Sequence, residues 1–172
     1  MNKDFLNIDL SGKTVVFTGG TDGMGKEAVK KIAKMGANIM LLGRSKEKSL
    51  AVVKELNGIA GEENATFVQC DLSAQESICK AAQTVLNVCP TLDYIINCAG
   101  ANFGERKLSK DGHEMTWAVN HLAPFLLNHM LLERLKENPN AKIINLSSAT
   151  ERSGRIHFGD IGLTKGWSTF KS

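Results

Sequence analysis

Residues 18–25 read TGGTDGMG, and this stretch decides the fold through what stands on either side of it. The run from Lys13 to Thr18 before it is apolar and β-rich, which predicts a buried strand. From Met24 to Met35 apolar residues recur at close to helical spacing. A glycine turn between a strand and a helix predicts a phosphate-binding loop, because the helix N-terminus offers free N–H groups and a positive dipole end. An ordinary glycine turn is the alternative, which the flanking strand and helix disfavour.

Strand and helix continue to alternate along the rest of the chain. Four further strands are expected, at Asn38–Leu42, Thr66–Cys70, Tyr94–Asn97 and Lys142–Leu146. Helices are expected between them. One is expected at Lys46–Asn57, and another begins after a capping box formed by Ser73 and Glu76. A third is expected over Gly112–Lys136, where Pro124 marks a break or a new helix start. Parallel neighbours need crossover connections, so this alternation predicts an α/β fold with a doubly wound parallel sheet, the Rossmann fold.

Composition and charge narrow the class of protein. The chain has 172 residues, 42% of them apolar and 23% charged, which is typical of one soluble globular domain. A net charge of +3 is too small to predict nucleic-acid binding. The four cysteines form no CxxC pair, so no metal site is expected. Residues 1–10 contain no long apolar run, so neither a signal peptide nor a membrane anchor is expected, and a cytoplasmic location follows.

Four more short motifs stand in register with the expected strands. They are Asp71 after the third strand, Asn97-Cys98-Ala99-Gly100 after the fourth, Asn120 in the next helix and Ser147-Ser148 after the fifth. Together with the GxxxGxG spacing of residues 19–25, they resemble the short-chain dehydrogenase/reductase family, from Ser11 to about Phe158. The family fold usually has seven strands, of which five are expected here. An extended, epimerase-like relative is disfavoured because those proteins usually carry GxxGxxG spacing.

The resemblance implies a role for each motif. Cofactor-binding positions would be Gly19, Thr21, Gly23, Met24, Gly25, Arg44, Asp71, Leu72, Asn97, Ala99 and Gly100. Asp71 is similar to the family's contact to the adenine amino group, and Asn97 with Gly100 to the stretch that lines the ribose. Asn120 is similar to the Asn that holds a water in the proton relay, and Ser148 to the catalytic Ser. Helix entry for Asp71, a strand-end turn for Asn97 and a turn or cap for Ser148 are the alternatives.

The end of the second strand indicates which dinucleotide is bound. Enzymes that use NAD usually place an acidic residue there to hold the ribose diol, whereas this chain has Gly43-Arg44-Ser45. An arginine fork matches a 2'-phosphate, so NADP(H) is expected in preference to NAD(H). An exposed Arg that merely opens a helix is the alternative, since the glycine loop holds no second basic residue.

The residues that would supply the proton are missing. In the family a YxxxK motif does so, because a phenol with a pKa of about 10 needs a nearby Lys to act near neutral pH. The only tyrosine is Tyr94, inside an expected strand. Trp167 and Lys171 have WxxxK spacing, but an indole has no usable acid function. The sequence GRIHF at residues 154–158 resembles a subgroup of the family, the retinol dehydrogenases and related carbonyl reductases, in which the interval from this serine to the tyrosine is long. The chain is therefore expected to stop just before the tyrosine and to be inactive as it stands.

These expectations combine into one assignment. Residues 1–12 would form an arm, 13–148 an NADP(H)-binding Rossmann domain, and 149–172 a loop that leads to the missing catalytic helix. The resemblance to this subgroup implies an oxidoreductase acting on a small-molecule alcohol or carbonyl, retinal-like or otherwise hydrophobic, with a homo-oligomer possible in the full-length form. A non-catalytic dinucleotide-binding or regulatory protein is the alternative.

Overall fold

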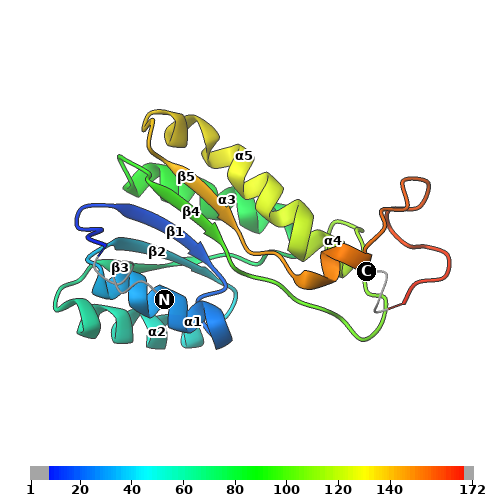
Figure 1. Cartoon of the computed structure of the whole chain (residues 1–172), viewed down its shortest axis with the longest axis horizontal. Coiled ribbons are helices and arrows are strands. Elements are labelled where there is room, and N and C mark those ends of the chain that lie inside the picture. The colour runs from blue at the N-terminus through cyan, green and yellow to red at the C-terminus, as the bar shows by residue number, and fades with distance from the viewer. Residues whose placement is uncertain (1–7, 169–172) are drawn as a thin grey trace.

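The structure, a computed structural model, describes residues 8–168 apart from the side chain of Ser153 (Figure 1). The strands are β1 (Thr14–Thr18), β2 (Asn38–Gly43), β3 (Ala65–Gln69), β4 (Tyr94–Asn97) and β5 (Lys142–Asn145). The helices are α1 (Gly23–Lys34), α2 (Lys46–Ala60), α3 (Gln75–Val88), α4 (Met115–Trp117) and α5 (Ala123–Lys136), with a π-helical turn η2 (Ala118–Leu122) and a 3-10 helix η3 (Ala149–Ser153). Every strand lies within one residue of its expected bounds.

The five strands form one parallel sheet in the order β3-β2-β1-β4-β5. From β1 the chain builds outward through β2 to β3, and then crosses back so that β4 pairs with the other side of β1. Val15 pairs in register with Tyr94 across that junction. The predicted doubly wound α/β fold is therefore confirmed.

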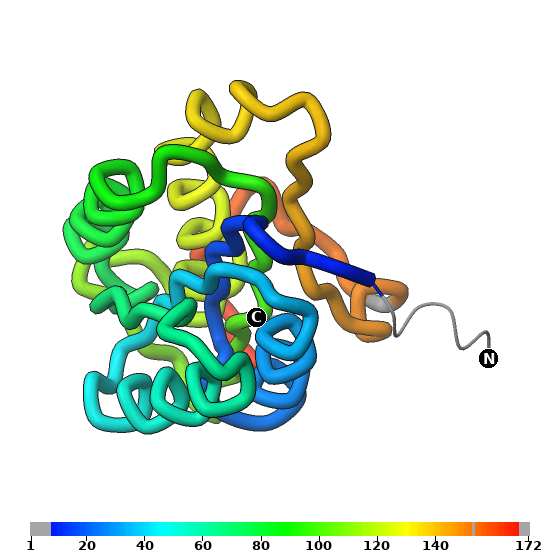
Figure 2. The backbone as a smooth tube through the Cα atoms, turned by 90° about the vertical axis from the view of Figure 1, so that its left-hand side faces the viewer, coloured from blue at the N-terminus to red at the C-terminus, as the bar shows by residue number. Residues whose placement is uncertain are grey.

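Helices cover both faces of the sheet, as Figure 2 shows. Successive side chains of a strand point to opposite faces, so a strand buried on both sides must be apolar throughout. On one face, α1 and α2 pack against a cluster that includes Val15, Phe17, Ile39 and Leu41. On the other face, α3 and α5 pack against a cluster that includes Val16, Met40, Leu42 and Ile95. This alternation explains why the apolar runs were recognisable as strands.

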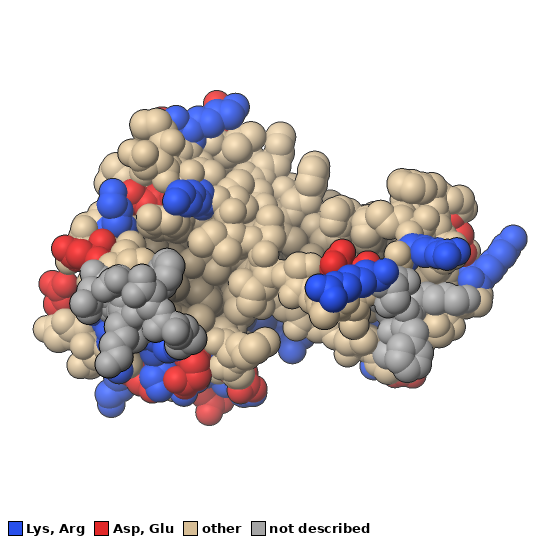
Figure 3. Space-filling view, in the orientation of Figure 1, with Lys and Arg blue, Asp and Glu red and all other residues tan. Residues whose placement is uncertain are grey.

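The strand β5 lies at one edge of the sheet and is exposed along its length. It pairs with β4, with Ile143 beside Ile95 and Ile144 beside Ile96. Ile143 and Ile144 are 36% and 42% exposed, and Leu146 just beyond them is 49% exposed. Few charged side chains lie over the centre of the face shown in Figure 3. The edge of the sheet nearest the serine motif is thus apolar and open.

The capping box expected at the start of α3 is wrong. Ala74 is the N-cap and its side chain makes no capping hydrogen bond. Ser73 turns away, and its hydroxyl donates to Oδ1 of Asp71 at 2.7 Å. The backbone N–H of Gln75 donates instead to Oδ2 of Asp111 at 2.8 Å, from a loop 36 residues further along. A side chain from a distant segment has replaced the local cap, which the spacing of residues 73–76 could not reveal.

Helical backbone runs from Met115 to Lys136 without a stop, so the expected break at Pro124 takes a milder form. Residues 118–122 form a π-helical turn that ends two positions before the proline. Pro124 has no N–H to donate to the carbonyl of Asn120, and its ring would crowd that carbonyl in a regular α-helix. The wider turn relieves this conflict, and such turns often stand at functional sites.

The segment after β5 was expected to be a loop, and it contains more structure than that. It opens with η3 and continues as turns, among which Leu163 is the one non-glycine residue of the described chain with a positive φ, at 45°. Lys171 lies outside the described residues, as do residues 1–7 of the arm and 169–172 of the tail. Within residues 8–168, no helix has the length and apolar character needed to cross a bilayer.

Candidate functional site

The C-terminal ends of all five parallel strands lie at the same end of the sheet, across the strand direction. In open α/β sheets, ligands bind outside these ends where the strand order reverses. Here the reversal lies between β1 and β4, because the chain leaves β1 toward β2 and returns to β4 on the opposite side. The glycine loop follows β1 and the segment 98–100 follows β4, so two of the sequence motifs face each other at this point.

The glycine loop touches the segment after β4 backbone to backbone. Gly19 has a φ of +76°, and a Cβ at this position would lie 2.5 Å from the amide nitrogen of Ala99. A Cβ on Gly25 would lie 2.1 Å from the carbonyl oxygen of Gly19. The N–H of Ala99 also donates to Oγ1 of Thr18 at 3.3 Å. The first and last glycines of the motif are thus required by contacts within the protein.

The middle glycine faces open space. Gly23 has a φ of +52°, and a Cβ there would have no atom within 4 Å. Met24 beside it is 83% exposed, at the first turn of α1. Asp22 is the N-cap of α1, and its Oδ1 accepts from the N–H of Gly23 at 2.8 Å. A ligand could approach the backbone here, and it would meet the carboxylate of Asp22, which the sequence interpretation overlooked.

Arg44 stands at the end of β2 with its side chain exposed. Its backbone is held, because its carbonyl accepts from Nε2 of Gln69 at 2.8 Å. Within residues 8–168, no hydrogen bond or ion pair engages its guanidinium. Ser45 follows as the N-cap of α2 and accepts from the N–H of Lys48 at 3.4 Å. The guanidinium of Arg44, the hydroxyl of Ser45 and the N-terminus of α2 thus belong to consecutive residues. Together they form a suitable binding site for an anion.

Asp71 follows β3 and is partly occupied by its own neighbours. Its Oδ1 accepts from the N–H of Ser73 at 3.0 Å and from the Ser73 hydroxyl, and Lys110 Nζ lies 3.6 Å from its Oδ2. Partial burial acts to raise the pKa of this carboxyl. The hydrogen bonds from Ser73 and the charge of Lys110 outweigh that effect, so the pKa lies below its ordinary value. Asp71 is therefore ionised near neutral pH, and its carboxylate holds Ser73 in the turn that precedes α3. Its contact to adenine stays a prediction.

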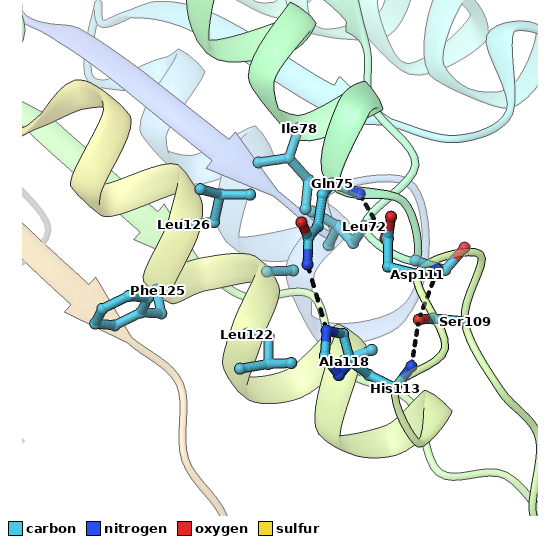
Figure 4. A pocket seen from close by; sticks show the side chains of 12 residues that line it. Leu72, Gln75, Ile78, Ser109, Asp111, His113, Ala118, Leu122, Phe125 and Leu126 are labelled. Carbon is cyan, nitrogen blue, oxygen red and sulfur yellow. Dashed lines mark hydrogen bonds between the residues drawn. The ribbon is translucent and has the colours of Figure 1, made fainter.

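A pocket of about 260 Å³ lies between the start of α3 and the helical segment 115–126. Apolar side chains such as Leu72, Ile78 and Leu126 form much of its lining, and Gln75 and His113 lie within hydrogen-bond distance of one another at its mouth (Figure 4). Of the predicted cofactor positions, Leu72 alone lines this pocket. The pocket is therefore separate from the glycine loop.

Asn97, at the end of β4, is buried and joins three elements. Its Nδ2 donates to Oδ1 of Asn128 in α5 at 3.0 Å and to Oδ1 of Asn145 in β5 at 2.8 Å. The N–H of Leu146 also donates to the Asn97 carbonyl at 2.9 Å. The side chain of Asn97 thus fixes β5 and α5 relative to β4. Asn128 and Asn145 were not recognised from sequence, because nothing in their spacing connects them.

Asn120 lies in the π-helical turn and clasps the segment after β4. Its Oδ1 accepts from the N–H of Ala101 at 2.9 Å, and its Nδ2 donates to the Ala101 carbonyl at 2.8 Å. Gly100 lies next to this clasp, since a Cβ there would be 3.7 Å from Asn120 Oδ1. The side chain of Asn120 is thereby committed to the protein backbone. A water-holding role for Asn120 in a proton relay stays a prediction.

Ser148 follows β5 at an exposed position and caps the short helix η3. Its Oγ accepts from the N–H of Thr150 at 3.3 Å and from the Thr150 hydroxyl at 2.9 Å. These contacts correspond to the turn or cap that was its alternative interpretation. Asn120 and Ser148 are held by different segments, and their roles in chemistry stay predictions.

The loop between β4 and α4 contains contacts that sequence reasoning missed. Asp111 caps α3, Lys110 pairs with Asp71, and Arg106 donates to backbone carbonyls of the tail. The dipeptide Asp111-Gly112, with Gly112 at a φ of +82°, is a recognisable turn signal, but it does not reveal the residues that Lys110 and Asp111 contact.

All four cysteines are free, and burial raises the pKa of Cys70 to about 12. Within residues 8–168, no cluster of His, Cys, Asp or Glu could hold a metal ion.

Comparison with known proteins gives a consistent result. A family model described as short chain dehydrogenase matches residues 13–165. Human retinol dehydrogenase 11 is 40% identical over 154 residues, which cover 90% of this chain and 48% of that protein. A solved metagenomic short-chain oxidoreductase in complex with NADP is 32% identical, with a TM-score of 0.72, over 81% of this chain and 63% of that one. The chain spans about half the length of the curated relatives that it matches.

A second solved structure extends the likeness of fold to almost the whole chain. An uncharacterised protein from Mycobacterium paratuberculosis superimposes with a TM-score of 0.81 at 25% identity, over 95% of this chain and 56% of that one. The elements that carry the glycine loop, Arg44, Asp71 and the segment after β4 all lie within the residues that the family model matches.

Proposed function

The chain belongs to the short-chain dehydrogenase family, and from that premise we propose that residues 13–148 form the NADP(H)-binding unit of an oxidoreductase acting on an alcohol/carbonyl pair. The observation that carries this proposal is the glycine loop at the junction of β1 and β4. Gly19 and Gly25 pack against backbone, while Gly23 leaves the start of α1 open. A pyrophosphate at that opening would meet free N–H groups and the positive end of the helix dipole.

The preference for a 2'-phosphate is supported by the end of β2. Arg44 has an exposed guanidinium, and the next residue, Ser45, caps α2. Strand β2 ends at Gly43 and is followed by Arg44 and Ser45, so no carboxylate stands where the ribose diol of NAD would be held. The metagenomic relative with NADP bound agrees with this choice.

When bound, the dinucleotide would supply or accept the hydride. The chain's own residues would position it: Asp71 beside the adenine, Asn97 and Gly100 beside the ribose. Asn120 would hold a water of the proton relay, and the Ser148 hydroxyl would orient the substrate oxygen after giving up its contact with Thr150. A hydrophobic carbonyl such as an aldehyde of the retinal type is the proposed substrate class, from the names of the relatives.

These residues do not supply the proton. Tyr94 is the only tyrosine in the sequence, and it is the first residue of β4, in register with Val15 and Lys142 at the opposite edge of the sheet from the site. We therefore propose that the 172 residues bind the cofactor without measurable turnover. A non-catalytic dinucleotide-binding role is the second candidate, and the position of Tyr94 is the observation in its favour.

The experiment is a titration of the chain with NADPH and NADH, followed by fluorescence or calorimetry. Arg44→Ala should weaken NADPH by about 10- to 100-fold and leave NADH unchanged, because it removes hydrogen bonds to a charged group. Lys54→Ala, which removes one exposed charge from α2, is the control for net charge and should change neither. Failure of both dinucleotides to bind would overturn the proposed function. Equal loss of both in Arg44→Ala would overturn the 2'-phosphate assignment alone.

A further inference from the structure

The loop between β4 and α4 touches two distant parts of the chain. At one end Arg106 reaches the tail: its Nε donates to the Leu163 carbonyl at 3.1 Å and the Gly162 carbonyl at 3.3 Å, and its Nη2 donates to the Gly162 carbonyl at 3.0 Å. Figure 1 shows this loop and the tail at the same end of the molecule. A guanidinium can serve two adjacent carbonyls because its donors lie in a fixed planar fork.

The tail segment that Arg106 holds is strained. Leu163 has a φ of 45°, a conformation that side chains other than glycine rarely adopt, and it is only 7% exposed. Asp160 closes the turn, since its carboxylate accepts from the N–H of Thr164 at 2.9 Å and of Lys165 at 3.0 Å. A residue in this conformation persists only where the surroundings fix it. Arg106 fixes it from outside the turn, by binding the carbonyl of Leu163 and the one before it.

The other end of the same loop touches the adenine side of the proposed cofactor site. Lys110 Nζ lies 3.6 Å from Asp71 Oδ2, and the N–H of Lys110 donates to the Ser73 carbonyl at 3.2 Å. Asp111 caps α3 through the N–H of Gln75. Residues 106–111 therefore form a short connector, with the tail at one end and the residue proposed to bind adenine at the other.

We propose that Arg106 is a positioning residue, and that the connector 106–111 transmits dinucleotide binding at Asp71 to the strained turn at residues 160–165. The transmission rests on the proposed function, whereas the clamp by Arg106 does not. The tail follows Ser148 directly, and its apolar side chains Ile156 and Phe158 are 62% and 81% exposed. Arg106 ties this turn to the loop between β4 and α4 and so fixes the far end of the segment that begins at Ser148, and the position of these side chains relative to the serine depends on the clamp.

Amide hydrogen exchange of residues 160–168, measured by mass spectrometry on the 172-residue chain, tests the clamp without any cofactor. Arg106→Ala should speed exchange of these amides about tenfold or more, since each lost bond involves a charged donor. Arg106→Lys, which keeps the charge but not the fork, should give an intermediate increase. Arg155→Ala is the matched control on the same tail, because no hydrogen bond or ion pair engages that side chain within residues 8–168, and it should leave exchange unchanged. Unchanged exchange in both Arg106 variants would overturn the clamp.

The transmission is tested by repeating the measurement with saturating NADPH. Exchange of residues 160–168 should slow several-fold in the natural chain, and this protection should disappear in Arg106→Ala while NADPH still binds. If NADPH binds by titration but leaves exchange of the tail unchanged, the transmission is wrong and the clamp stands. If NADPH does not bind at all, the proposed function and the transmission fail together, while the cofactor-free comparison of Arg106 variants still decides the clamp. Urea unfolding of each variant confirms that a change of exchange is local.

Discussion

Gly19→Ala tests whether the site depends on the backbone contact between the glycine loop and the segment after β4. Ordinary van der Waals contact begins at 3.4 Å, and the new Cβ would lie 2.5 Å from the Ala99 nitrogen, so the two segments would have to separate by about 0.9 Å. Overpacking of this kind costs about 1–3 kcal/mol. The positive φ of Gly19 adds about 1–2 kcal/mol for a residue with a Cβ. We expect a loss of unfolding free energy of about 2–5 kcal/mol.

Gly61→Ala is the matched control for this variant. Gly61 has a φ of +77°, almost the same as Gly19, but a Cβ there meets no atom within 4 Å. It should therefore lose only the conformational contribution of about 1–2 kcal/mol. The difference between the two variants isolates the steric contribution of the loop contact.

The assay combines urea unfolding, followed by circular dichroism, with NADPH titration of the folded fraction. Gly19→Ala should lose more stability than Gly61→Ala and should lose NADPH binding, whereas Gly61→Ala should bind as the natural chain does. Equal stability losses in the two variants, with NADPH binding intact in both, would refute the reasoning. In that case the loop tolerates separation and the contact with Ala99 does not organise the site.

Three further predictions follow from single side chains. Asp22→Asn keeps an acceptor for the N–H of Gly23 but removes a charge, so NADPH affinity should rise roughly fivefold by titration; no change would mean that this carboxylate does not face the cofactor. The folded-state pKa of Asp71 is depressed, so its contribution to stability is complete above pH 3.8 and disappears as pH falls further. Asp71→Asn should therefore flatten the pH dependence of the urea midpoint below about pH 4, and an unaltered slope would contradict this. Cys70 should resist alkylation at pH 8, because burial raises its pKa to about 12; labelling as fast as that of an unfolded thiol, by mass spectrometry, would count against its burial.

The fold was accessible from the sequence because its signals are local and repeated. The central strands β1 and β2 are apolar runs whose alternate side chains meet helices on opposite faces, and the exposed edge strand β5 has a similar apolar run, so all five strands could be placed within one residue. The strand ends then carry the polar motifs to one edge, because the strands are parallel. The need for glycine at position 25 has the same local origin, since the nearest neighbour of Gly25 is Gly19 in the same strand-turn-helix unit. The neighbour of Gly19, in contrast, is Ala99 in the segment after β4.

The features that escaped prediction depend on contacts between distant segments. Ser73 has the spacing of a cap, but Asp111 takes that place from another loop. Pro124 predicted an interruption, whereas packing of α5 against the sheet keeps the segment helical and confines the conflict to a π-helical turn. The asparagine cluster around Asn97 is formed by three separate elements, so no local pattern could indicate it.

The pairing of β1 with β4 has a consequence for how the site comes into existence. Val15 and Tyr94 are in register, so 79 positions of chain separate the two strands that flank the reversal of strand order. Strands β1, β2 and β3 can associate one after another as they emerge from the ribosome, with a single helix between neighbours. The loop that brings β4 to the free side of β1 is far longer, and closing it costs entropy that short-range pairing does not. The glycine loop therefore contacts the segment after β4 only when this late, long-range step is complete. The capacity to bind a dinucleotide then indicates that the sheet has finished assembling.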